Sequence, residues 1–274
     1  MRRRLVILGA LAFVPAFAQV QDEAPSQTSM EKIAPRQFGP VRDLTDHGDG
    51  TATSGNWSGY AVLGSSFQWA KGSWVVPAAN CSGVAKDQYA AFWVGLDGYS
   101  STTVEQTGTD SDCVGSTPNY YAWYEFYPKA SFEISSVPVK PGDVISALVY
   151  YNSSTERFIA EITNETTGKS FKTSAAVAGA LRSSAEWITE APCCTASGGF
   201  LPLSDFGTVN FGKDSTGISA TNWALDSSNE GAIGSFAAVN TILIDKTASR
   251  SSPQTSTCSA LSSDKTSFSC TWAP

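Results

Sequence analysis

The stretch "DVISALVYYNSSTERFIAEITN" at residues 143–164 decides the fold class. Its two runs, "DVISALVYYN" and "RFIAEITN", are rich in β-branched and aromatic residues and have the length of strands. The polar "NSSTE" at 152–156 joins them and has the composition of a hairpin loop. The stretch therefore predicts two antiparallel strands connected by a short turn.

Similar runs recur along the chain. In "YYAWYEFYP" (120–128), alternate side chains point to opposite faces, with Trp123 and Glu125 on one face and Tyr124 on the other. Further strand-like runs end in Gly or Asp: "QYAAFWVGLDG" (88–98), "SDFGTVNFG" (204–212) and "FAAVNTILID" (236–245). One segment, "AAVAGALRSS" (175–184), predicts a short helix. Many short strands separated by turns indicate an all-β protein, an antiparallel sandwich or barrel.

The N-terminus has the features of a targeting signal. "MRRRLVILGALAFVPAFAQ" contains three arginines, an apolar run and a small-x-small site that ends at Ala18. We interpret residues 1–18 as a secretory signal peptide and expect a secreted, extracellular protein. No later segment approaches ~20 apolar residues, so we expect no membrane anchor. Export to an oxidising compartment makes the six cysteines disulfide candidates.

Residues 19–53 differ in composition from residues 54–274. They are rich in Pro, Asp, Gln, Ser and Thr and poor in aromatic residues, so alone they bury little apolar surface. We interpret them as a propeptide, with a solvated N-terminal tail as the alternative. Residues 54–274 have the length of one large β domain, in which 247–274 form a C-terminal segment.

Charge and residue types exclude several function classes. Residues 54–274 carry 12 Lys and Arg against 19 Asp and Glu, which disfavours nucleic acid or an anionic membrane as partner. The single histidine, His47, lies in the proposed propeptide. Without it, a Ser-His-Asp or Cys-His hydrolase and a His-ligated zinc site are excluded. We also find no phosphate-binding or dinucleotide-binding motif, and expect neither cofactor nor metal.

Carboxylates, amides and aromatic side chains remain as candidates. "SSAEWITEAPCC" at 183–194 holds Glu186 and Glu190, four positions apart. Along a strand they would lie ~13 Å apart, farther than the roughly 5–9.5 Å that glycosidase carboxylates need. A cross-strand pair such as Glu125 with Glu190 would still meet that requirement. Aspartic proteolysis lacks support, since no Asp-Thr-Gly or Asp-Ser-Gly motif is present.

Seven motifs occur in a fixed order along the chain. They are "NWSGYAV" (56–62), "FWVGLDG" (92–98), "VEQTGTD" (104–110), "AWYEFYP" (122–128), "VKPGDVISA" (139–147), "AEWITEAP" (185–192) and "DFGTVNF" (205–211). In this combination, which covers most of 55–212, the chain resembles the glutamic peptidase (eqolisin) family of secreted acid endopeptidases.

The resemblance implies a fold and a catalytic pair. The fold is a two-sheet antiparallel β-sandwich, concanavalin A-like, with a concave substrate groove. The pair is Gln106 and Glu190, which would make the chain a pepstatin-insensitive acid endopeptidase acting on proteins or peptides, and we expect a monomer. The matching positions also imply supporting or groove-lining residues: Trp57, Trp93, Asp97, Asp110 and Glu125. Asp97 equally suits a turn, and Glu186 suits a structural role.

The chemistry of the pair is suited to acid. A glutamate near its reference pKa of ~4.3 is partly ionised in mild acid, so Glu190 can accept a proton from water and later return it. The amide of Gln106 does not titrate and can donate to a developing oxyanion at any acid pH. The alternatives are a β-sandwich glycoside hydrolase and a carbohydrate-binding module that uses exposed Trp.

The cysteines predict covalent links around this pair. Cys81 precedes the strand of Trp93 and Cys113 follows that of Gln106, so we expect a bond between these two cysteines. We expect a second bond between Cys258 and Cys270 in the C-terminal segment. The adjacent Cys193 and Cys194 either bond to each other under strain or bond elsewhere.

Overall fold

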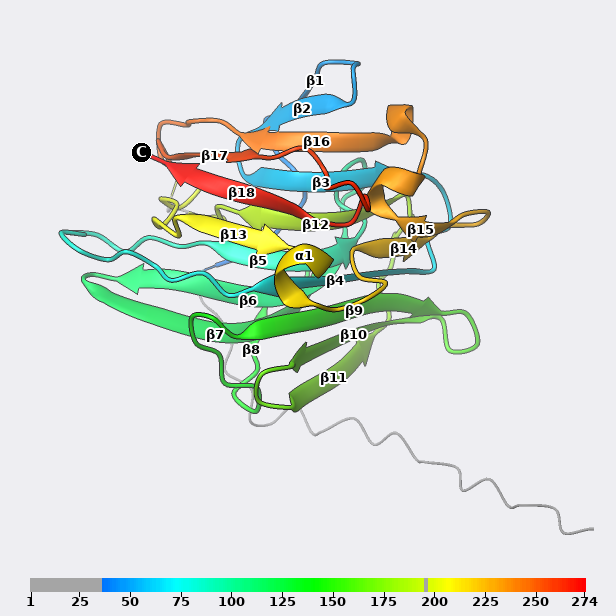
Figure 1. Ribbon diagram of the computed structural model, residues 1–274, viewed down its shortest axis with the longest axis horizontal. Coiled ribbons are helices and arrows are strands. Elements are labelled where there is room, and N and C mark those ends of the chain that lie inside the picture. The colour runs from blue at the N-terminus through cyan, green and yellow to red at the C-terminus, as the bar shows by residue number, and fades with distance from the viewer. Residues whose placement is uncertain (1–35, 195–196) are drawn as a thin grey trace, which may run out of the picture.

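A computed structural model describes residues 36–194 and 197–274. The predicted signal peptide, 1–18, and the first part of the predicted propeptide, 19–35, lie outside the described residues. The described chain forms two layered sheets of antiparallel strands, which run across the view in Figure 1. The predicted hairpin at 143–164 is confirmed, since Val144–Asn152 (β9) pairs with Arg157–Asn164 (β10).

The first sheet carries most of the motifs found in the sequence. Its strands, in spatial order, are β8 (Phe132–Glu133), β7 (Thr117–Tyr127), β6 (Val104–Val114), β5 (Ala91–Leu96), β12 (Ser184–Glu190), β3 (Trp57–Leu63), β16 (Thr241–Lys246), β2 (Thr51–Ser54) and β1 (Thr45–Asp46). Only the pairing of β2 with β16 is parallel among the described strands. Strands distant in sequence, such as β5 and β12, are therefore neighbours in space.

The second sheet packs against the first. Its strands are β11 (Lys169–Ala175), β10, β9, β4 (Trp69–Val75), β13 (Thr208–Phe211), β18 (Phe268–Ala273) and β17 (Thr255–Cys258), with β14 (Trp223–Leu225) also on β4 and β15 (Glu230–Ala232) beyond it. The pairing of Lys246 with Ser256 joins the sheets at one edge. The predicted two-sheet β-sandwich is confirmed.

The two-residue period of the strands separates two apolar clusters. Phe92, Tyr124 and Trp187 project into the core between the sheets. Trp93 and Trp123, one residue away in β5 and β7, project to the opposite face of the first sheet. The first sheet is therefore buried on both faces, and its second face also packs against residues before β1.

One predicted element is wrong. The segment 175–184 forms no helix, because backbone N–H groups of residues 181–183 donate to the carboxylate of Asp97 instead of to helical carbonyls. A segment so short has little helical stability of its own to compete with these bonds. The α-helix of the described chain is the four-residue α1 (Lys213–Thr216), and β16 begins only at Thr241, after the short 3₁₀ helix η3 (Ala238–Asn240).

Three disulfide bonds link the described cysteines. Cys81 bonds to Cys113 and Cys258 to Cys270, the two pairs expected from the sequence. The third bond joins Cys193 to Cys194. The bond between Cys81 and Cys113 ties the end of β6 to the segment that leads into β5.

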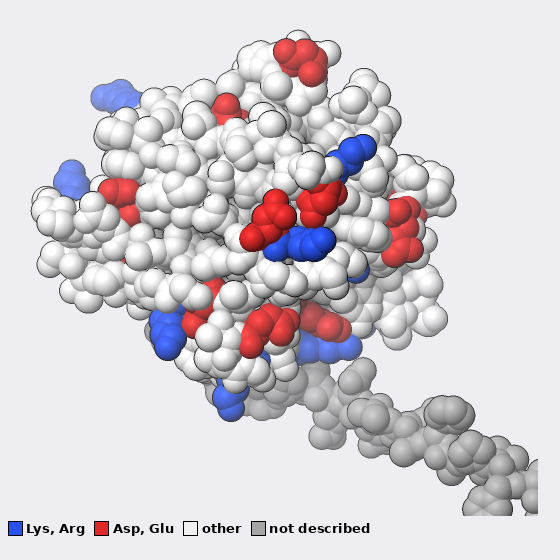
Figure 2. All heavy atoms as spheres, in the orientation of Figure 1, with Lys and Arg blue, Asp and Glu red and all other residues white. Residues whose placement is uncertain are grey.

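The surface carries few charges. On the face drawn in Figure 2, acidic and basic side chains are scattered and intermixed among uncharged ones, in keeping with the 16% of charged residues in the sequence. Among the described residues, no helix has the length and apolar character needed to cross a membrane. Several carboxyl groups lie instead inside the molecule: Glu105, Asp110, Asp112, Glu125, Glu186 and Glu190.

Candidate active site

Strand register places the predicted pair on one face of the first sheet. Gln106 of β6 lies opposite Glu125 of β7, and Glu190 of β12 lies opposite both Trp57 of β3 and Ala91 of β5. Side chains of register partners share a face. Residues from five strands therefore meet above a sheet whose other face forms the main core.

Glu190 is fully buried and hydrogen-bonded at both oxygens. Its Oε1 accepts from Nδ2 of Asn56 at 3.2 Å, and its Oε2 accepts from Nε1 of Trp93 at 3.0 Å. The indole of Trp57 packs edge-on against Trp93, with 5.0 Å between ring centres. Burial raises the pKa of Glu190 well above its ordinary value, although the bonds from Asn56 and Trp93 oppose the rise. These surroundings therefore favour the protonated form of Glu190.

A glycine makes room for the Trp93 ring. Gly95 lies two residues along β5, and a Cβ on it would approach Cζ3 of Trp93 to 2.9 Å and the carbonyl oxygen of Glu105 to the same distance. Contacts that short do not occur for real Cβ atoms. The absence of a side chain at position 95 therefore lets the indole lie along the sheet, where its N–H reaches Glu190.

Gln106 and Glu125 form the second part of the site. Nε2 of Gln106 donates to Oε2 of Glu125 at 3.1 Å, and both side chains are fully buried. Burial, followed by the charge of Glu190, raises the pKa of Glu125 well above its ordinary value. Glu125 and Glu190 are not cross-strand partners, because β6 and β5 lie between β7 and β12.

Residues 36–42, the N-terminal strap, cross this site. The carbonyl oxygen of Phe38 accepts a hydrogen bond from Nε2 of Gln106, and the N–H of Phe38 donates to Oε2 of Glu125 at 3.0 Å. The N–H of Gly39 faces the carboxyl group of Glu190, where it is one of the groups that lower the pKa of that residue. The two ends of one peptide bond, Phe38–Gly39, thus lie beside the two members of the predicted pair.

The strap is held on both sides of that peptide bond. Gln37 and Cys193 exchange two backbone hydrogen bonds, of 2.8 and 3.0 Å. The Phe38 ring stacks on Trp123, with 3.9 Å between ring centres. Beyond Gly39, the carbonyl oxygen of Pro40 accepts from Nδ2 of Asn56 at 3.3 Å. The strap is therefore bound through main-chain hydrogen bonds and side-chain pockets, the manner in which extended peptides add to a sheet edge.

Asp110 and Asp97 have different surroundings. Asp110 lies on the same face of β6 as Gln106, is fully buried, and accepts from the hydroxyl of Tyr121 at 2.7 Å. Asp97 comes directly after β5 with a φ of +67°, and its carboxylate accepts from the N–H groups of residues 181–183 at 2.7–2.9 Å. Its hydrogen bonds fix the loop that leads into β12, so Asp97 has the role of a turn residue.

The sequence reasoning missed several residues of the site. Asn56 contacts both Glu190 and the strap. The one feature of the sequence that could have indicated its role is its position beside Trp57 in "NWSGYAV". Asp112 and Tyr121 continue the two-residue period from Asp110 and Trp123, which could have indicated them. Phe38 gave no signal, because it lies in a segment poor in aromatic residues.

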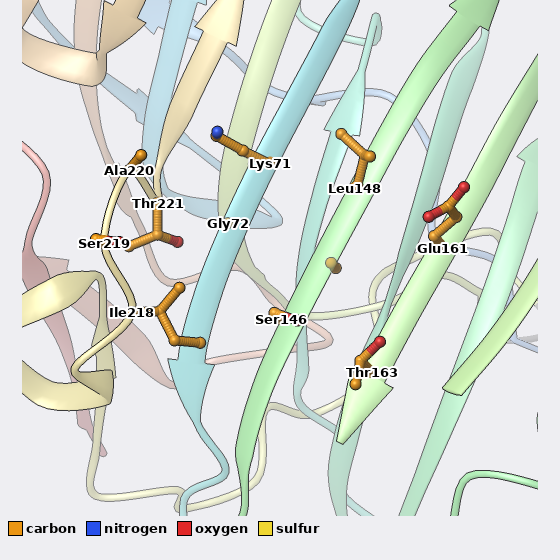
Figure 3. A pocket seen from close by; sticks show the side chains of 11 residues that line it. Lys71, Gly72, Ser146, Leu148, Glu161, Thr163, Ile218, Ser219, Ala220 and Thr221 are labelled. Atoms are coloured by element: carbon orange, nitrogen blue, oxygen red, sulfur yellow. The ribbon is translucent and has the colours of Figure 1, made fainter. Parts of the chain in front are cut away.

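A separate hollow lies on the second sheet. Figure 3 shows it between Lys71 of β4, Ser146 of β9, Glu161 of β10 and the loop 218–221, and its volume is about 220 Å³. None of the residues that contact the Phe38–Gly39 bond lines it. The site of the predicted pair is instead occupied by the strap.

Comparison with known proteins identifies the family. The model of the Peptidase A4 family matches residues 55–269. Aspergillopepsin-2 of Aspergillus niger is 30% identical over 179 residues, 58% of this chain and 62% of that protein. Scytalidopepsin B of Scytalidium lignicola is 35% identical over 161 residues, 55% of this chain and 58% of that protein. The chain thus aligns with less than two thirds of the length of these two relatives.

Solved structures agree with the sequence matches. Scytalido-glutamic peptidase, crystallised with a transition state analog inhibitor, has a TM-score of 0.63 and 27% identity, covering 80% of this chain and 98% of that one. Aspergilloglutamic peptidase from Aspergillus niger has a TM-score of 0.53 and 25% identity, covering 68% and 99%. The resemblance to the glutamic peptidases is confirmed, and the chain belongs to the Peptidase A4 family.

Proposed function

We propose that this protein is a secreted acid endopeptidase that uses Gln106 and Glu190. The observation that carries the proposal is the peptide bond of the strap, whose carbonyl accepts a hydrogen bond from Gln106 and whose N–H faces Glu190. A substrate peptide bound in the same way would place its carbonyl oxygen, which becomes negatively charged, beside Gln106. Its amide nitrogen, which receives a proton, would lie beside Glu190. The glutamic peptidases among the similar structures, one of them bound to a transition state analog, support this assignment.

The proposed mechanism is built on those two contacts. Ionised Glu190 takes a proton from a water molecule, and the water oxygen attacks the carbonyl carbon next to Gln106. The carbonyl oxygen becomes an oxyanion, which Nε2 of Gln106 stabilises by the bond that already reaches that oxygen in the strap. Glu190, now protonated, returns its proton to the amine nitrogen as the peptide bond breaks.

Glu125 and Asn56 position the pair in this scheme. Glu125 accepts from Nε2 of Gln106, which fixes the amide with its N–H groups toward the carbonyl. Asn56 donates to Glu190 and to the carbonyl of the strap residue after Gly39, so it aligns the base with the chain beyond the bond. Preorganised groups of this kind avoid reorganisation at the moment of reaction.

We also propose that the strap belongs to a propeptide covering 19–53. With the strap in place, burial favours the protonated form of Glu190, and a protonated carboxyl group cannot act as base. The second cut is proposed between about Asp43 and Gly55. Within that range the exposed hairpin loop between β1 and β2 is the accessible site, whereas Ala52 in β2 is buried and β2 pairs with β16.

We also propose a location and partners for the protein. A signal peptide at 1–18 would export the chain, and the enzyme would act on protein or peptide substrates as a monomer, without nucleic acid. A glycoside hydrolase would need Glu125 and Glu190 as a cross-strand pair, but two strands separate them and Glu125 accepts a hydrogen bond from Gln106. The family assignment favours the peptidase over that enzyme and over a carbohydrate-binding module.

A digestion assay tests the proposal. The purified full-length secreted protein, incubated in acid, is expected to hydrolyse casein between about pH 2 and pH 5 in the presence of pepstatin, serine and thiol reagents, or EDTA. N-terminal sequencing of the active enzyme locates the second cut. Loss of activity on addition of EDTA alone would contradict the Gln106–Glu190 mechanism. An active protein that still begins at Gln19 would contradict the removal of a propeptide.

A further inference from the structure

Four asparagines stand in the acceptor pattern for N-linked sugars, Asn-x-Ser or Asn-x-Thr. They are Asn56, Asn80, Asn152 and Asn164. An N-linked oligosaccharide is bulky and polar, so it must lie on the surface of the folded protein. The pattern is the same at all four positions. The surroundings of each side chain in the structure therefore decide which asparagine is able to carry a sugar.

Asn56 has no hydrogen to exchange for a sugar. Glycosylation replaces one of the two hydrogens on the amide nitrogen Nδ2. At Asn56 this nitrogen donates to Oε1 of Glu190 at 3.2 Å and to the carbonyl oxygen of Pro40 at 3.3 Å, and the residue is 2% exposed. A sugar there would remove at least one of these bonds and would have to fit beside the fully buried Glu190. The folded chain therefore requires an unmodified Asn56.

Asn164 is excluded for the same reason. Its Nδ2 donates to Oδ2 of Asp143 at 2.7 Å and to the carbonyl oxygen of Pro138 at 3.0 Å. Its Oδ1 accepts from the N–H of Thr167 at 3.2 Å, which fixes the turn between β10 and β11. The residue has no exposed surface. Leaving one of these buried groups without its partner would cost free energy, in addition to the lack of space.

Asn152 has the opposite surroundings. It ends β9 and is followed by residues 153–157, all of them exposed, in the turn that leads into β10. This turn lies at the edge of the molecule in Figure 1. The Oδ1 of Asn152 accepts from the N–H of Ser154 at 2.9 Å, whereas its Nδ2 is not buried and has no hydrogen-bond partner among the described residues. A sugar on Nδ2 would thus break no hydrogen bond and would extend into solvent.

Asn80 is intermediate between these cases. It is exposed, but its Nδ2 donates to Oδ2 of Asp205 at 3.0 Å. Its backbone N–H donates to the carbonyl oxygen of the same residue at 2.7 Å, and the next residue, Cys81, is bonded to Cys113. One hydrogen on Nδ2 remains available, although the side chain is held against a neighbouring loop. Asn80 is therefore a poorer acceptor than Asn152.

We propose that Asn152 is the N-glycosylation site of this protein, and that Asn56 and Asn164 are unmodified in the secreted chain. The amide nitrogen of Asn152 forms a bond to the anomeric carbon of an oligosaccharide that is activated as a lipid-linked pyrophosphate. The bond from that carbon to the pyrophosphate oxygen breaks, and the nitrogen loses one proton. The inference rests on the proposed signal peptide, which would bring the chain into a secretory pathway, and it goes beyond the proposed peptidase activity.

Site mapping tests the inference on the full chain, secreted with its own N-terminal segment from a yeast that glycosylates exported proteins. Peptide N-glycosidase in heavy-oxygen water converts each glycosylated asparagine to a labelled aspartate, which peptide mass spectrometry locates. We expect the label at position 152, a lower occupancy at 80, and unlabelled asparagine at 56 and 164. Secreted protein without label at 152 overturns the inference, and label at 56 or 164 contradicts the argument from burial.

A matched pair of variants in the same turn supplies the control. Ser154→Ala removes the hydroxyl that the acceptor pattern requires and leaves Asn152 in place, whereas Ser153→Ala changes the middle position, which accepts any residue except proline. Both serines are exposed, so both variants are expected to fold. The sugar at Asn152 should be lost from Ser154→Ala and retained by Ser153→Ala, and a sugar that persists in Ser154→Ala overturns the inference.

Casein hydrolysis in acid, measured on the same preparations, separates this inference from the proposed function. A secreted protein that carries the sugar at Asn152 but does not cleave casein contradicts the peptidase proposal alone. An active secreted protein without sugar at Asn152 contradicts the glycosylation site alone. A chain that stays in the cell without any sugar contradicts the signal peptide and the inference with it.

Discussion

Replacing Glu190 by glutamine is the sharpest test of the proposed mechanism. The substitution preserves the size of the side chain but removes the group that accepts a proton from water. General acid–base groups typically contribute about 10²–10⁴ in rate. We expect turnover of a fluorogenic peptide by Glu190→Gln to fall by at least that factor, because the same carboxyl group serves in both proton transfers.

The structure also gives the cost in stability. Glu190 accepts one hydrogen bond at each oxygen, from Asn56 and from Trp93. A glutamine can accept at its single carbonyl oxygen, so one of the two donors faces an NH₂ group and loses its partner. Losing one buried hydrogen bond costs about 1–3 kcal/mol, which is tolerable for a domain with three disulfide bonds. The variant is therefore expected to fold.

Glu186→Gln is the matched control. Glu186 is also buried, lies on the same strand and has a pKa raised by burial, but it is ~13 Å along the strand from Glu190. Peptide hydrolysis in acid, measured beside near-UV circular dichroism, should be retained by this variant. A folded Glu190→Gln enzyme that retains most activity, or a folded Glu186→Gln enzyme without activity, would refute the assignment of Glu190 as the base.

The same contacts give three further predictions. Gln106→Ala should lower kcat by about 10²–10³, the usual effect of removing one oxyanion donor; steady-state kinetics at the optimum pH check this, and an unchanged kcat contradicts it. Arg36→Gln should shorten the lag before activity develops when the full-length protein is acidified, since the strap loses its ion pair with Asp112; an unchanged lag would show that Arg36 does not help to hold the strap. Finally, the folded-state pKa values of Glu105, Glu186 and Glu190 are raised above their unfolded values by burial. Their contribution to stability is therefore complete below the unfolded pKa of ~4.3 and is lost as the pH rises toward the folded values. The midpoint of thermal unfolding should fall as the pH rises above ~4.3, and a midpoint that rises with pH there would contradict this expectation.

The sequence alone determined the strands and the identity of the candidate pair. Alternation in "YYAWYEFYP" correctly separated Trp123 from Tyr124, because side-chain direction in a strand depends only on the position along the chain. The ordered motifs indicated Gln106 and Glu190, although their chemical roles remain a proposal. The helix expected at 175–184 is absent, because backbone N–H groups of that segment donate to the distant Asp97 carboxylate and so override a marginal helical preference.

Only the tertiary structure decided what surrounds the pair. Asn56, Trp93 and Glu190 come from three parts of the chain, and they meet because β5 and β3 flank β12 in one particular register. The strap has no apolar periodicity, and much of its order comes from main-chain bonds to Gln106, Glu125 and Cys193. Such bonds use the backbone, which is the same for every residue type and so leaves no pattern in a sequence.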